Sequence, residues 1–179
     1  MTSQTINLTI LKKYFKDCSK QDLEKDITEI FRKYPAIKEY YQTKLLPQAN
    51  EEIIAKYKKI IENEFFPTRG YGNAKLSVAK KAIADYKKTC QFPEKLIDIM
   101  LFYVEQGVKF TNAYGDINEA FYNSMENMFD KAVELICKED LKDSFDERCQ
   151  KIVGDTCDIG WGFYDTLSEI YNDAFEILI

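Results

Sequence analysis

The chain has 179 residues, of which 45% are hydrophobic, 31% charged and 14% aromatic, and its net charge is −5. This length and composition predict a globular protein with a core of its own and exclude a largely disordered chain. Histidine is absent. Its absence excludes hydrolases with an imidazole base, HExxH zinc sites and the Glu-x-x-His iron sites of ferritin-like bundles.

The sequence also predicts the compartment. The first fifteen residues lack the basic and apolar regions of a secretory signal, and no segment approaches the roughly 18 consecutive apolar residues that span a membrane. The five cysteines are irregularly spaced and form no CxxC motif: Cys18, Cys90, Cys137, Cys149 and Cys157. We therefore expect a cytoplasmic protein with reduced thiols, no membrane association, no metal site and no cofactor.

Five helices are predicted in the first half of the chain. Apolar spacing and capping residues place the first helix at about 9–17 and the second after the cap Ser19, ending at about Lys33. The other three are expected at about 35–45, 51–66 and 76–88. The second of these helices has an apolar stripe that predicts one buried face: Leu23, Ile27, Ile30, Phe31 and Tyr34. The last has Ala79, Ala82, Ile83 and Tyr86 on its predicted inner face.

Four helices are predicted in the second half, at about 93–113, 116–138, 140–153 and 163–178. The first is apolar on nearly all sides and should be enclosed by neighbours. Asp116, with Glu119 three residues later, predicts a capping box at the start of the second. Eight or nine helices in consecutive hairpins predict an all-α fold, either α-solenoid-like or an irregular helical bundle. We expect one domain over residues 1–179, with 1–8 as a flexible N-terminus.

The charge differs strongly between the two halves of the sequence. Residues 1–90 carry 18 Lys and Arg against 11 Asp and Glu, a net of +7, whereas residues 91–179 carry 7 against 19, a net of −12. Such polarity can steer a polyanion to one end or pair the basic end of one copy with the acidic end of another. The alternative is two solvated halves whose difference has no function.

The first candidate site is a glycine loop followed by a row of lysines. Its residues are Arg69, Tyr71, Lys75, Lys80, Lys81, Lys87 and Lys88, with Gly70 and Gly72 in the loop. Free backbone amides, an aromatic ring and several cations could hold a phosphate or a nucleic-acid backbone. The spacing matches no nucleotide-binding motif, and a solvated helix face would give the same lysines.

The second candidate site is a cluster of carboxylates and aromatic rings in DTCDIGWGFYD. Its residues are Asp155, Asp158, Trp161, Tyr164 and Asp165. Three carboxylates could bind a divalent cation or supply an acid and a base, although the spacing is not that of an EF-hand. The alternative is a helix cap at Asp158 with Trp161 as a buried plug.

The third candidate site is the polar turn between the two most apolar helices. Its residues are Asn112, Tyr114, Gly115, Asp116 and Glu119. The turn could line a pocket, but a C-cap glycine followed by a capping box accounts for the same residues.

Three stretches carry a resemblance to a known family: LSVAKKAI, MLFYVEQGVKFTNAYGDINEAFYNSMENMF and DTCDIGWGFYDTL. They resemble segments of domain-of-unknown-function family 6155, over about Ile10 to Phe175. The resemblance implies a small all-helical bacterial protein. It implies no activity and no functional residues.

Three hypotheses for function follow from the residues. The first is a non-enzymatic protein-interaction module that binds another protein or a second copy, because catalytic motifs are lacking, aromatics are abundant and the halves have opposite charge. The second is a nucleic-acid or phosphate binder that uses the basic face from Arg69 to Lys88. The third is a carboxylate- or metal-dependent enzyme at Asp155, Asp158 and Asp165. No catalytic residue can be assigned.

Overall fold

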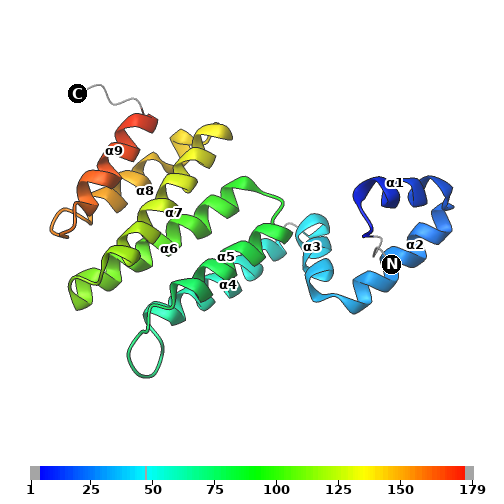
Figure 1. Ribbon diagram of the computed structural model, residues 1–179, viewed down its shortest axis with the longest axis horizontal. Helices are drawn as coiled ribbons and strands as arrows, with labels where there is room; N and C mark the ends of the chain where they lie inside the picture. Colours follow the sequence, from blue (N-terminus) through cyan, green and yellow to red (C-terminus); the bar gives the residue numbers. More distant parts are fainter. Residues whose placement is uncertain (1–4, 47, 176–179) are drawn as a thin grey trace.

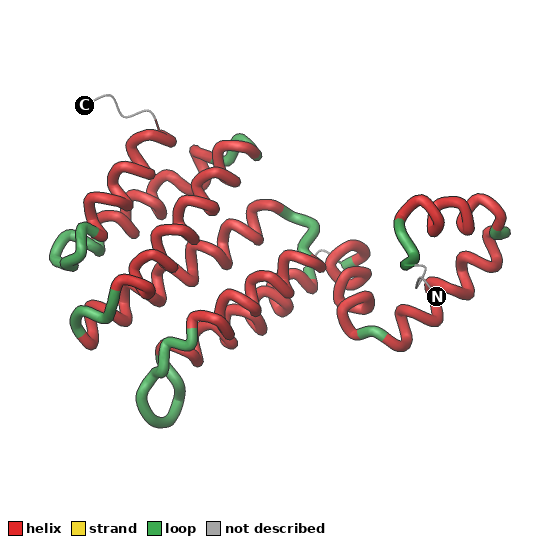
Figure 2. Tube along the Cα trace, in the orientation of Figure 1, coloured by secondary structure: helices red, strands yellow, loops and turns green. Residues whose placement is uncertain are grey.

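The computed structural model describes residues 5–46 and 48–175. In these ranges it contains nine α-helices and no strand (Figures 1 and 2), which confirms the predicted all-α fold and is consistent with a helical bundle. The helices are α1 (Leu8–Asp17), α2 (Lys20–Lys33), α3 (Pro35–Leu45), α4 (Ala49–Phe65), α5 (Leu76–Thr89), α6 (Pro93–Tyr114), α7 (Glu119–Lys138), α8 (Lys142–Gly154) and α9 (Phe163–Phe175).

The predictions for the two ends of the chain fall partly outside the described residues. Residues 1–4 of the expected flexible N-terminus lie outside the described residues, and Leu8 already belongs to α1. The last helix is described up to Phe175, and its predicted extension to residue 178 lies outside the described residues.

The hydrophobic core lies among α4 to α9, which we call the body. Helix α6 is buried on several sides, as its uninterrupted apolar sequence predicts, because α4, α5, α7 and α8 all pack against it. Gly107 allows α7 to come close: a Cβ at this position would lie 2.2 Å from Sδ of Met125. None of the described helices combines the length and apolar character that a membrane crossing requires.

Helix α5 confirms the inner face predicted for it. Ala79, Ala82, Ile83 and Tyr86 are all buried. The four lysines of the helix are exposed on its other sides.

Helix α3 attaches the N-terminal part of the chain to the body through polar contacts. The Glu39 carboxylate, whose side chain is 12% exposed, accepts hydrogen bonds from Tyr57 Oη at 2.7 Å and Thr89 Oγ1 at 3.1 Å and pairs with Lys56 Nζ at 2.8 Å. Thr43 Oγ1 donates to the Thr89 carbonyl at 2.9 Å. Because these partners lie on α4 and at the end of α5, α3 is fixed on the body at several points.

Helices α1 and α2, which we call the arm, project from the body beyond α3 (Figure 1). Their N-terminal ends are capped: Asn7 accepts from the amides of Thr9 and Ile10, both at 3.0 Å, and Ser19 forms a capping box with Asp22. The cap predicted at Ser19 is therefore confirmed. The arm's local sequence thus specifies two helices, although little of the body packs against them.

Candidate protein-interaction surface

The arm exposes the apolar stripes of both its helices. No described residue of α1 or α2 is buried. We define the arm apolar face by the eight side chains that are between 36% and 56% exposed: Ile10, Leu11, Tyr14, Phe15, Ile27, Ile30, Phe31 and Tyr34. The prediction that the stripe of the second helix would be buried is wrong, because α3 packs against this stripe at Phe31 and still leaves Ile27, Ile30, Phe31 and Tyr34 exposed.

Two side-chain contacts hold the arm in shape. Tyr14 Oη on α1 donates to Asp26 Oδ2 on α2 at 2.8 Å, and the Phe31 ring lies edge-on to Tyr41 of α3 with ring centroids 6.1 Å apart. Both contacts involve residues that remain partly accessible. The arm is thus positioned by a few surface contacts and presents its apolar face to solvent.

A shallow groove lies between α7 and α9 on the body, and we call it the acidic groove. Its volume is about 730 Å³. Its apolar part is formed by Val133, Ile170 and Ala174. Its charged walls carry two carboxylates from each helix: Asp130 and Glu134 from α7, Glu169 and Asp173 from α9. Within the described ranges none of these four forms an ion pair, although Glu134 also lines a hollow with Lys87, Lys131 and Lys138.

The residues of the predicted basic site are all exposed, in the loop before α5 and on α5 itself. Arg69 and Tyr71 lie exposed in the loop before α5, and Lys75 lies exposed directly before the helix begins. Lys88 pairs with Asp85 on its own helix at 2.6 Å, which partly neutralises that side of the row. The remaining members of the row, Lys80, Lys81 and Lys87, are also exposed.

Two lysines of α5 face lysines of α7 that the sequence analysis did not connect with them. Lys80 and Lys131 line one hollow, and Lys87 lines a second hollow with Lys131, Lys138 and the carboxylate Glu134. Residues about 50 positions apart carry no local pattern that would reveal this arrangement. Helical spacing could only have shown that Lys80 and Lys87 share a side of α5.

The predicted carboxylate and aromatic cluster is exposed and open. Asp155, Asp158, Tyr164 and Asp165 are all exposed, and Asp155 pairs with Lys151 one helical turn earlier at 2.6 Å. In the part of the chain that the structure describes, no three Cys, Asp or Glu side chains are arranged to hold a metal ion. The cluster therefore lacks the enclosed geometry that would favour chemistry between its carboxylates.

Trp161 differs from its predicted burial. Its side chain is 59% exposed, and it stacks on one side against Tyr122 with ring centroids 6.1 Å apart and 27° between the planes. Its φ of +67° places it in the left-handed region, in a tight turn that directs the indole across the surface. The prediction of a buried plug is wrong because the neighbouring Phe163, fully buried, fills the core position instead.

The turn between α6 and α7 confirms one predicted cap and corrects the other. Gly115 ends α6 with φ of +84°, as a C-cap glycine should. The N-cap of α7 is Asn118, which accepts from the Phe121 amide at 3.0 Å, and not Asp116. Asp116 instead accepts from Tyr122 Oη at 3.1 Å. Residues 116–118, the start of the predicted helix, are therefore not helical.

The second and third candidate sites lie next to each other. Asn112 Nδ2 donates to the Asp155 carbonyl at 3.1 Å, and a Cβ on Gly160 would lie 3.3 Å from the Asp116 carboxylate. These loops and the glycine loop after α4 lie along the same edge of the body (Figure 1). Tyr114, exposed at this edge, stacks on Phe66 at the base of the glycine loop.

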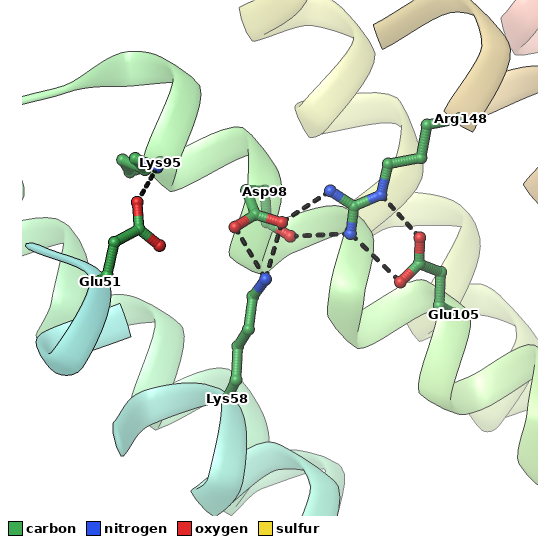
Figure 3. A network of polar contacts seen from close by, with 6 residues as sticks. All are labelled: Glu51, Lys58, Lys95, Asp98, Glu105 and Arg148. Atoms are coloured by element: carbon green, nitrogen blue, oxygen red, sulfur yellow. Dashed lines mark hydrogen bonds and ion pairs between the residues drawn. The ribbon is translucent and has the colours of Figure 1, made fainter. Parts of the chain in front are cut away.

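A network of ion pairs joins three helices of the body, and the sequence analysis missed it (Figure 3). Arg148 on α8 binds Glu105 through Nε at 2.6 Å and Nη2 at 3.1 Å, and its Nη1 lies 2.7 Å from Asp98 Oδ1 on α6. Lys58 on α4 reaches the other Asp98 oxygen at 2.7 Å. Lys95 and Glu51 form a further pair between α6 and α4.

In this network, the opposite charges of neighbouring side chains outweigh the effect of burial on their pKa values. Burial works to raise the pKa of Asp98, but the hydrogen bonds and charges of Lys58 and Arg148 outweigh it and leave that pKa below its usual value. Burial likewise works to lower the pKa of Arg148, and Glu105 and Asp98 raise it on balance. All its charges are matched, so the network holds helices together and has no free group for a ligand.

Comparison with known proteins gives a family and no activity. The model of a family of unknown function, DUF6155, matches residues 7–176. The chain belongs to this family. Because the match spans the arm as well as the body, both are parts of the unit that defines DUF6155. No curated protein and no solved structure matches the chain.

The thiols of this DUF6155 member should differ sharply in reactivity. Cys149 is buried, and burial raises its pKa to about 12, whereas Cys137 and Cys157 are exposed. In native protein we expect a thiol reagent such as dithionitrobenzoate to label Cys137 and Cys157 rapidly and Cys149 only after unfolding. Mass spectrometry of labelled peptides checks this, and rapid labelling of Cys149 in folded protein would contradict its burial.

Proposed function

We propose that the chain is a non-enzymatic protein-interaction module, one helical domain that binds a protein partner through the arm apolar face. One observation carries the proposal. Of the 18 large hydrophobic side chains that are exposed in the described residues, 12 lie between Ile6 and Leu46. Exposed apolar side chains gathered in one part of a protein often mark a protein interface, because their contact with water is unfavourable.

The shortness of the arm helices supports the same proposal. Helix α1 has 10 residues and α2 has 14, lengths at which an isolated helix is only marginally stable in water. Burial of their apolar stripes against a partner would supply the missing stabilisation. An amphipathic helix laid on a partner's surface is a common recognition mode.

Other features support a binding role in a reducing compartment. All five cysteines are free thiols, as expected of a cytoplasmic protein. The candidate enzyme site has less support, since its carboxylates are exposed and one is already paired with Lys151.

Site-specific photo-crosslinking in cells tests the proposed function. A photoreactive phenylalanine analogue at Phe31, on the arm apolar face, should give a discrete adduct with a protein. The matched control places the same analogue at Lys25, which is exposed on the side of α2 opposite the apolar stripe. Adducts at Phe31 and none at Lys25 would support the module. No adduct at Phe31, or equal adducts at both positions, would reject it.

A second candidate function is polyanion binding, which the lysines between α5 and α7 favour. Lys80, Lys87, Lys131 and Lys138 line two adjoining hollows that share Lys131. Reversing Lys80 and Lys131 to glutamate should abolish retention of nucleic-acid probes at about 0.1 M salt and flatten the salt dependence of binding. The matched control reverses Lys81 and Lys88. No retention of any probe by the wild-type chain would reject this candidate.

A further inference from the structure

The acidic groove and helix α1 are complementary in charge and in apolar pattern. We propose that the acidic groove of one copy binds α1 of a second copy, so that the chain associates head to tail. This inference rests on the proposed function, because it names the partner of the arm. The two surfaces belong to opposite ends of one molecule, as Figure 1 shows, so the contact is between copies.

The groove is built to receive a cation-flanked helix. Asp130 and Glu134 stand one helical turn apart on α7, and Glu169 and Asp173 stand one turn apart on α9. Like charges at this spacing repel and destabilise a helix slightly, and none of the four carboxylates forms an ion pair within the described residues. Lys138, at the edge of the groove, is engaged with Glu139.

Helix α1 carries the matching pattern. Ile10, Leu11, Tyr14 and Phe15 form an apolar arc, and at about 100° per residue Lys12 and Lys13 fall about 60° beyond its two edges. Neither lysine forms an ion pair within the described residues.

The two patterns fit when the arc faces the groove. The apolar arc would then rest on Ile170 and Ala174, with one lysine facing the carboxylates of α7 and the other those of α9. Burial of the arc provides affinity, and the flanking charges fix the orientation. The contact is heterologous, because it joins different surfaces of the two copies, and it therefore produces rings or open chains of molecules.

Charge exchange between the two surfaces tests the contact. The arm-reversed variant carries Lys12→Glu and Lys13→Glu, and the groove-reversed variant carries Glu134→Lys and Glu169→Lys. Each alone should weaken association of the full chain at least about tenfold in sedimentation velocity, because like charges then meet. An equimolar mixture should associate again, since the reversed arm of one variant fits the reversed groove of the other. A misfolded variant could not give this rescue.

Two control variants distinguish the effect of charge at the contact from the effect of the protein's net charge. Lys25→Glu with Lys109→Glu changes net charge as much as the arm-reversed variant, and Glu62→Lys with Glu147→Lys matches the groove-reversed one. These four residues are exposed and lie outside α1 and the groove. Both control variants should associate like wild type. Wild-type association should also weaken from about 0.05 to 0.5 M salt, as the Debye length falls from roughly 14 to 4 Å.

Other outcomes overturn the inference without deciding the proposed function. A wild-type chain that stays monomeric throughout the salt range has no second copy as its partner. Association that survives both reversals, or a mixture that fails to associate, places the contact elsewhere. In each case the crosslink from Phe31 still reports whether the arm binds a different protein.

Discussion

Replacing Arg148 with methionine is expected to lower the free energy of unfolding by about 3 kcal/mol, the loss typical of removing one partner from a largely buried ion pair. The side chains of Arg148, Asp98 and Glu105 are only about one quarter exposed. Without the guanidinium, the Glu105 carboxylate loses its bidentate partner and Asp98 keeps only Lys58. Methionine fills similar space, so the loss reports on charge and hydrogen bonding.

Urea denaturation followed by circular dichroism measures this loss. The control is Lys151→Met on the same helix, which removes an exposed pair with Asp155 and should cost under about 0.5 kcal/mol. Arg148→Lys should fall between the two, because it keeps a charge but cannot bridge both carboxylates. A loss as small as that of the Lys151 control would show that the network does not bind α8 to α6.

The effect should depend on pH in a defined direction. The pKa of Asp98 is lowered in the folded state, so the unfolded chain takes up the proton first as pH falls. The stabilisation from this carboxylate is therefore complete above its unfolded pKa of about 3.9 and is lost as pH drops through the lower folded value. The stability difference between wild type and Arg148→Met should shrink below about pH 4.

The sequence was sufficient for the helices because their signals are local. Apolar spacing, Pro93 and the caps at Ser19 and Gly115 all act within a few residues. The error at Asp116 arose where two polar side chains, Asp116 and Asn118, could each cap the same helix. The choice depends on Tyr122, which takes Asp116 as its hydrogen-bond acceptor.

The candidate surfaces depend on contacts between distant segments, which local patterns cannot specify. An apolar stripe shows which side of a helix avoids water, but it does not show what covers that side. The same pattern is buried in α5 and exposed in α2. The acidic groove brings Glu134 close to Glu169 and the network joins Arg148 to Glu105, pairs that are more than 30 positions apart in the chain, and no spacing rule in one segment predicts that.

Amide hydrogen exchange should show that the arm is the least protected helical part of the described chain. With no buried residue, α1 and α2 can open without exposing the core, whereas α6 opens only with the body. We expect arm amides in the monomer to exchange at least about 10³-fold faster than those at the centre of α6, whose protection follows global stability.

Association should reverse part of this difference. When the arm apolar face is covered by a partner, opening α1 must first break that contact, so its amides should slow at least about tenfold at concentrations well above the dissociation constant. Mass-spectrometric exchange at about 0.05 and 0.5 M salt, with the arm-reversed variant as the control, separates bound from free arms. Arm amides as protected as those of α6 in a monomer would mean that the arm packs on its own body, and the exposed face would then lose its role as an interface.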